Sequence, residues 1–223
     1  MNLKSFTFWF SAASTATLVY GCLVEANKLV VERNELWLRG WPKWLDGFKI
    51  ALLADLHLRD SYSIELAQRA IDLALDESPD FVCLAGDFVG YWKPESFGML
   101  GQVLEPLLLM RGKVVAVPGN HDYWSGDATL LEPVFDEFNI KLLRNEVWHH
   151  SGVTWAGIDS ANAKKSDPFT TMAQAALHDA PTIVLWHEPD VVRYLPEGAV
   201  LMLSGHSHGG QFTFPWGWTP MHT

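Results

Sequence analysis

Metal-ligating side chains recur along this chain, and each group of them follows directly on a short apolar run. With their polar endings, these runs read "IALLADLH", "FVCLAGD", "VVAVPGNHD", "TIVLWH" and "VLMLSGHSH". Short apolar runs that end in turn residues are typical of buried strands. The candidate ligands at their ends are two carboxylates, one amide and four imidazoles: Asp55, His57, Asp87, Asn120, His187, His206 and His208.

This set of side chains is suited to binding two divalent metal ions. Its donors are nitrogen and oxygen only, which favours Mn, Fe, Zn or Co and does not suit an iron–sulfur cluster. Seven ligands are too many for one ion, whereas two ions about 3.5–4 Å apart that share a carboxylate would use them all. Such a pair activates a water and clamps phosphate oxygens. Each motif alone is compatible with an ordinary turn, but five such strand ends together indicate a site.

The rest of the pattern predicts the elements that position these residues. Apolar residues recur at helical spacing between Ile64 and Leu75, with Ser63 as a candidate cap. Further helices are expected near residues 95–110 and 127–138, and residues 140–158 predict strands of a second, partly antiparallel sheet. Strands that alternate with helices indicate a layered α/β domain, in which ligands bind at the carboxyl ends of the strands. All five polar clusters are therefore expected to face one site.

The charge balance restricts the partners. The chain of 223 residues has 16 basic and 26 acidic residues and a net charge of −10. This argues against broad binding to nucleic acid, which requires clustered Lys and Arg. An anionic substrate then needs a local positive charge, which metal ions would supply. Cys22 and Cys83 lack the spacing of a metal site and are expected to be small buried residues without a disulfide.

Residues 1–27 are expected to form a membrane anchor or signal segment. Residues 6–24 carry no charge, and this length is near the roughly 20 residues that span a bilayer as a helix. A cleaved signal peptide is the alternative, but no clear cleavage site follows, which favours an uncleaved transmembrane helix. The Lys and Arg distribution favours the cytoplasmic side of a bacterial inner membrane for the rest of the chain.

The remainder is expected to divide into a linker and one catalytic domain. Residues 28–47 predict a β-like and turn-rich linker, because "KLVVERNELWLRG" partly alternates and "GWPKWLDG" is rich in turn residues. The catalytic domain is expected to span residues 48–223.

The order of the motifs resembles the calcineurin-like metallophosphoesterase superfamily over most of residues 48–211. The shared order is D-x-H, G-D, G-N-H-D, a strand-end His and G-H-x-H. "GHSHGGQ" and the N-terminal segment look like its bacterial YkuE/YaeI-type phosphodiesterase branch, related to UDP-2,3-diacylglucosamine pyrophosphatases. The resemblance implies an α/β fold, a four-layer αββα sandwich. It also implies hydrolysis of a phosphodiester or pyrophosphate bond in a small or lipid-linked substrate, with two divalent ions, manganese favoured.

The resemblance also assigns roles to the residues. One ion would be held by Asp55, His57, Asp87 and His208. The other would be held by Asp87, Asn120, His187 and His206, so that Asp87 bridges the two. His121 would be catalytic, stabilising the developing charge or protonating the leaving group. Asp122 would either orient His121 or be an ordinary turn residue, and both interpretations stay open.

The chain departs from the family pattern in two places. "GDFVG" has Gly90 where a polar residue is usual, which puts the support around the site or a substrate contact in doubt. The sequence ends 15 residues after His208, so the catalytic domain is expected to lack C-terminal strands of the family. Four tryptophans near the motif loops either line a substrate channel or a membrane-facing rim, or pack in the core: Trp92, Trp124, Trp216 and Trp218.

Two other functions are compatible with the same fold. One is a metal-binding scaffold without catalysis, and the other is a phosphoprotein phosphatase. Because all the ligands and His121 are present, the sequence favours an enzyme over a scaffold. The acidic balance disfavours a nuclease.

Overall fold

The computed structural model describes residues 3–24 and 27–210, which fall into two compact units, Met1–Asn34 and Glu35–Thr223. The first unit contains one helix, α1 (Leu3–Leu23), so a helix forms where residues 6–24 predict one. Within the described ranges, no helix combines the length and the hydropathy required to cross a membrane. A membrane-spanning role for α1 therefore stays a prediction.

The segment between α1 and the first strand differs from the expected linker. Residues 28–40 form no strand, because their partly alternating pattern has no neighbouring strand to pair with. Residues 41–47 belong to the second unit and pack against its core. Leu45 is buried in its core, and the indole Nε1 of Trp41 donates a hydrogen bond to the Leu45 carbonyl at 3.0 Å.

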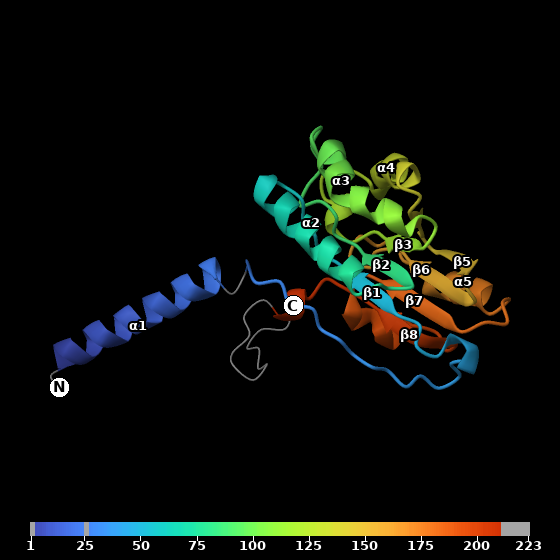
Figure 1. The fold of residues 1–223 in the computed structure, drawn as a ribbon, viewed down its shortest axis with the longest axis horizontal. Coiled ribbons are helices and arrows are strands. Elements are labelled where there is room, and N and C mark those ends of the chain that lie inside the picture. The colour runs from blue at the N-terminus through green and yellow to red at the C-terminus, as the bar shows by residue number, and fades with distance from the viewer. Residues whose placement is uncertain (1–2, 25–26, 211–223) are drawn as a thin grey trace. The chain divides into compact units, whose positions relative to one another are not determined.

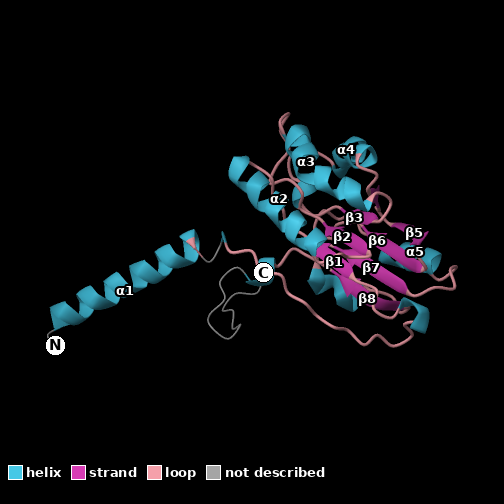
Figure 2. Ribbon diagram, viewed as in Figure 1, coloured by secondary structure: helices cyan, strands magenta, loops and turns pink. Residues whose placement is uncertain are grey.

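The described residues of the second unit form two four-stranded sheets (Figures 1 and 2). The first sheet is parallel throughout, in the order β1 (Ile50–Leu53), β2 (Phe81–Ala85), β3 (Val114–Val117) and β4 (Lys141–Leu142). The second has the order β5 (Glu146–His150), β6 (Val153–Ile158), β7 (Thr182–Trp186) and β8 (Ala199–Leu203). Only the β5–β6 pair is antiparallel. The predicted second sheet is confirmed, except that Lys141–Leu142 joins the first sheet.

Successive side chains of the central strands point to opposite faces of each sheet, and packing on both faces produces four layers. In β2, Phe81 and Cys83 pack between the sheets, while Val82 and Leu84 pack under the helices of the first sheet. In β7, successive side chains likewise divide between the inter-sheet core and the core under α5 (Pro168–Ala175). Because both faces are covered, these strands are apolar throughout. The αββα sandwich is as expected, and Cys83 is buried as expected.

Three helices cover the outer face of the first sheet: α2 (Ser61–Asp76), α3 (Ser96–Leu104) and α4 (Glu132–Glu137) (Figure 1). Ser63, predicted as a cap, is the third residue of α2. Asp60 is the N-cap, and the two side chains form a reciprocal capping box. α3 and α4 are shorter than the helices expected near residues 95–110 and 127–138. A 3₁₀ turn that contains Pro106 follows α3, and another precedes α4, which has Pro133 in its first turn. Proline lacks the backbone N–H that a continuing helix needs.

Residues 211–223 lie outside the described part of the chain. The expected C-terminal strand, the expected truncation of the sheet and the surroundings of Trp216 and Trp218 all fall there.

Candidate metal centre

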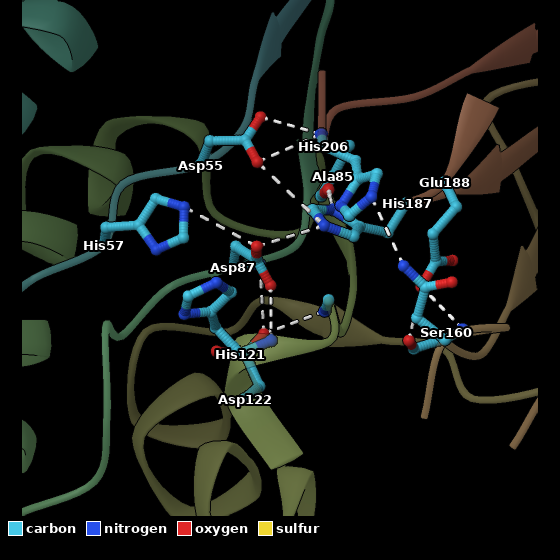
Figure 3. A network of polar contacts seen from close by, with 12 residues as sticks. Asp55, His57, Ala85, Asp87, His121, Asp122, Ser160, His187, Glu188 and His206 are labelled. Atoms are coloured by element: carbon cyan, nitrogen blue, oxygen red, sulfur yellow. Dashed lines mark hydrogen bonds and ion pairs between the residues drawn. The ribbon is translucent and has the colours of Figure 1, made fainter. Parts of the chain in front are cut away.

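The ends of five strands from the two sheets meet at one site (Figure 3). The first sheet contributes residues after β1, β2 and β3, and the second contributes residues after β7 and β8. The two sheets are joined there by the backbone N–H of His206, which donates to both carboxylate oxygens of Asp55 at 3.0 and 2.9 Å. Ligand-bearing loops that are far apart in the sequence therefore share one small volume, as the sequence predicted.

The first group of ligand atoms comes from Asp55, His57 and His208, and these atoms all lie within 4.8 Å of one another. The two Nε2 atoms of His57 and His208 are 3.0 Å apart, and His208 Nε2 is 3.6 Å from Asp55 Oδ1. The Asp87 carboxylate lies 3.6 Å from His57 Nε2. This is the set of side chains expected to hold one ion.

The second group consists of Asp87, His187 and His206, again within 4.8 Å of one another. His187 Nε2 is 3.2 Å from Asp87 Oδ2. Among the described residues, the buried Asn120 Oδ1 makes no hydrogen bond, and the buried His187 Nε2 faces the carboxylates of Asp87 and, at 4.0 Å, Asp55. A buried polar atom without a partner is costly, and a cation in this group would satisfy Asn120 Oδ1. The donor set thus fits a second divalent ion, with Asp87 common to the two groups.

The two groups of ligands differ in the pKa of a histidine, His57 in one and His187 in the other. Burial lowers the pKa of His57 to about 4, so its ring is neutral at pH 7, which is the form that binds a metal ion. Burial also favours neutral His187, but the neighbouring Asp87 carboxylate outweighs it and raises the pKa of His187 to about 9. A metal ion that binds His187 must therefore displace a proton.

Five of the ligands have a left-handed backbone, with φ of 43–68°: Asp55, His57, Asp87, His206 and His208. Such a conformation costs about 1–3 kcal/mol for a residue other than glycine. The loops are held in it by close packing. A Cβ on Gly119 would collide with the Asp87 carboxylate, and one on Gly205 would collide with Ala54 and Asp55. The glycine before His206 is therefore required for the approach of the two sheets.

Asp122 is fully buried and ties two ligand loops together. Its carboxylate accepts backbone N–H groups from Asp87 (3.1 Å), Phe88 (3.0 Å), Val89 (3.3 Å) and Gly119 (2.8 Å). Burial raises its pKa to about 7, against the effect of the Gly119 hydrogen bond. Asp122 lies in the 3₁₀ turn His121–Tyr123, and its carboxylate also binds the two ligand loops, so it is more than an ordinary turn residue. A role in orienting His121 stays a prediction.

The His121 ring is oriented by a backbone carbonyl. Its Nδ1 lies 3.1 Å from the Gly90 oxygen, and its backbone N–H donates to Asp87 Oδ1 at 2.8 Å. The ring packs edge-on against His57 and directly against Trp124. Gly90 therefore supports the site without a side chain. A ring nitrogen of His121 lies within 4.8 Å of the candidate ligand atoms of His57 and Asp87. That His121 is not a metal ligand therefore stays a prediction.

The sequence analysis missed two residues, Asn162 and Glu188. Asn162 Nδ2 lies 3.3 Å from His206 Nε2. The buried carboxylate of Glu188 accepts hydrogen bonds from Ser160 Oγ (2.5 Å), Ala161 N (3.1 Å) and Asn162 N (3.1 Å). Glu188 follows the strand-end His187 directly, which is a signal that could have identified it. Asn162 lies in a loop without a motif.

The two described tryptophans near the site have different roles. Trp92 packs against Phe97, and its Nε1 donates to the Asp122 carbonyl at 2.7 Å. Trp124 is 66% exposed and lines a cavity together with Asn120. The packing interpretation therefore holds for Trp92, and Trp124 is available to a ligand.

A family model described as "Calcineurin-like phosphoesterase" matches residues 48–210. The chain belongs to this family, as the order of its motifs predicted. The matched region contains all seven candidate ligands and His121.

Three relatives are informative. An uncharacterized metallophosphoesterase of Helicobacter pylori is 32% identical over 75% of this chain, which spans 46% of that protein. Phosphodiesterase YaeI of Escherichia coli is 31% identical over 75% of this chain and 63% of its own length. UDP-2,3-diacylglucosamine pyrophosphatase LpxG of Chlamydia muridarum is 26% identical over 92% of this chain and 77% of its own length. These relatives confirm the predicted branch, and the chain spans about half of the Helicobacter protein.

Proposed function

We propose that this protein hydrolyses a phosphodiester or pyrophosphate bond with the help of two divalent metal ions. The observation that carries the proposal is the pair of ligand groups that meet at Asp87, with the buried Asn120 Oδ1, which makes no hydrogen bond among the described residues, as a further candidate ligand. The names of YaeI and LpxG support the same class of reaction and a small or lipid-linked substrate. We favour manganese, because hard oxygen and imidazole donors suit it.

Each side chain has a role in this proposal. When bound, the two ions would neutralise phosphate oxygens and acidify a water. Asp87 joins the two halves of the site, and Asp122 holds the loops on which Asp87 and His121 lie. With Nδ1–H of His121 donating to the Gly90 carbonyl, the protonated form of the ring would give its Nε2 proton to the leaving oxygen and be left as the neutral imidazole.

Metal analysis combined with a rate assay tests the proposal. Purified protein is expected to bind about two Mn²⁺ ions and to cleave bis-p-nitrophenyl phosphate. Asp87→Asn is expected to lose metal and hydrolysis together, while His121→Ala keeps the metal and loses about 10²–10⁴-fold in kcat. Asp72→Asn, an exposed carboxylate on α2, is the matched control.

Two results would contradict the proposal. Metal binding without hydrolysis of any phosphodiester or pyrophosphate would favour the scaffold function. Loss of metal in His121→Ala would instead make His121 a ligand.

We also propose that α1 attaches the protein to a bacterial inner membrane, with the second unit in the cytoplasm. The uncharged stretch of residues 6–24 and the exposed aromatic residues Phe8, Trp9 and Phe10 support attachment. In cell fractionation, the full chain should sediment with membranes, and a variant without residues 1–27 should not. Equal distribution of both proteins would exclude the attachment, and protease access from the periplasm would exclude the cytoplasmic side.

A further inference from the structure

A cavity of about 470 Å³ adjoins the second group of ligands. Asn120, a predicted ligand, lines it, so the cavity and the metal centre share a wall. The loop around Tyr123 and Trp124 forms one side, and the loop around Asn162 and Lys165 forms the other. A phosphoryl group held by the metals would therefore have one of its ester arms close to this cavity.

The second loop, residues 159–167, is held by two side chains from other elements. Glu188 accepts three hydrogen bonds from it, and all of them come from residues 160–162. Asn145 donates to the Lys165 carbonyl at 2.8 Å and accepts the N–H groups of Asp159 and Asp167 at 3.1 and 2.8 Å. Burying a carboxylate costs free energy unless the group is hydrogen-bonded. The three hydrogen bonds from the loop offset this cost for Glu188, so the carboxylate and the loop stabilise each other. The loop is thus preorganised, although Asn162 and Lys165 are exposed on it.

The lining of the cavity has a distinct chemistry. Trp124 offers an exposed flat ring, and the Lys165 ammonium lies 5.8 Å from the centre of the Tyr123 ring. Asp127 also lines the cavity, but its Oδ1 accepts the Thr129 N–H at 2.9 Å and lies 3.9 Å from Arg144. The cavity therefore presents an aromatic surface and a lysine charge that faces it.

We propose that this cavity binds one ester arm of the substrate, and that this arm carries a ring and an anionic group. Trp124 stacks on the ring, and Lys165 pairs with the anion. Asn162 lines the cavity and contacts His206, so it hydrogen-bonds the polar atoms of the substrate between the reacting phosphate and the ring. The inference deepens the proposed hydrolase function and rests on it for the position of the reacting phosphate.

Two matched substrates test the pocket. Thymidine 5′-(p-nitrophenyl phosphate) has a ring on its ester arm, and the same compound with a 3′-phosphate adds an anion. With Mn²⁺ present, the 3′-phosphate is expected to raise kcat/KM of the wild type by about tenfold, in line with a charge-assisted hydrogen bond. Lys165→Ala should lose this increase, and Lys165→Arg should keep most of it. Lys164→Ala is the control, because Lys164 has the same charge one residue earlier but does not line the cavity.

The outcomes separate the pocket from the reaction. If wild type and Lys165→Ala respond equally to the 3′-phosphate, or if Lys165→Ala loses equally on both substrates, the pocket assignment is wrong and the hydrolase function stands. If the wild type cleaves neither compound, the binding of thymidine 3′,5′-bisphosphate is measured by calorimetry. Weaker binding by Lys165→Ala than by Lys164→Ala then supports the pocket, and equal binding overturns it.

Discussion

Two buried carboxylates, Asp122 and Glu188, have the same task in different halves of the site. Asp122 accepts four backbone N–H groups from the loops after β2 and β3, which carry Asp87 and His121. Glu188 accepts three hydrogen bonds from the loop after β6, which carries Asn162 and Lys165. One carboxylate supports the metal ligands and the other supports the cavity. Because different carboxylates hold the two halves, we expect mutations to affect the proposed metal binding and the proposed substrate recognition separately.

The largest effect is expected for Asp122→Asn. The new amide would place a donor against backbone N–H donors, so the protein should lose about 3 kcal/mol of unfolding free energy. Metal affinity should fall at least tenfold, because the Asp87 loop is released. Chemical denaturation and metal titration measure both, with Asp72→Asn as control. Unchanged metal affinity would show that Asp122 supports the fold only.

The second prediction concerns the pH dependence of the unfolding free energy, which we expect to arise from His187, a candidate metal ligand. The folded-state pKa of His187 is about 9, above the ordinary histidine value of 6.5. Its protonation therefore stabilises the metal-free protein fully below pH 6.5, and this contribution, on the order of 3 kcal/mol, is lost as the pH rises through 9. Metal affinity should rise over the same range, because the metal must displace the proton.

Unfolding of the metal-free protein at several pH values between 6 and 9.5 measures this contribution. His187→Gln is expected to flatten the decline, whereas Glu188→Gln should leave its slope unchanged. A His187→Gln variant with the wild-type slope would assign the titration to another group.

Glu188→Gln should have a smaller and more selective effect. It should cost about 2 kcal/mol of unfolding free energy and lower kcat/KM about tenfold for the substrate with the anionic arm. Mn²⁺ affinity should stay within about threefold of wild type, although Glu188 is adjacent to His187. Glu197→Gln, an exposed glutamate, is the control. Equal loss of metal in Glu188→Gln and Asp122→Asn would remove the distinction between the two halves.

The smallest effect is expected for Gly90→Ala. A Cβ at this position would meet the His57 carbonyl oxygen at 3.8 Å and the Arg59 Cβ at 3.9 Å, which are ordinary contacts. Because Gly90 contacts His121 through its backbone carbonyl, which the substitution keeps, kcat should stay within about twofold of wild type. A much larger loss would mean that the site needs the space of the missing side chain.

The two halves also differ in how far the sequence revealed them. Each of the predicted ligands lies within a few residues of the end of a short apolar strand, and such strands can be recognised from the sequence even though β1 and β8 are only partly buried. Their convergence followed from the rule that parallel strands present their carboxyl ends together. The linker at residues 28–40 and the lengths of the second and third helices were predicted less well, because partner strands and proline positions decided them.

Local patterns at strand ends were sufficient to predict the seven candidate ligands, and the order of these motifs carried the family resemblance that implied the αββα fold and the role of His121. Tertiary structure alone decided what Asp122, Gly90 and Glu188 do. Asp122 binds loops more than 30 residues apart, and Glu188 binds a loop 26–28 residues away. Lys165 becomes a binding candidate only because Asn145 and Glu188 hold its loop beside Asn120. A hydrogen bond between distant segments leaves no periodicity in the sequence, so only the folded chain reveals it.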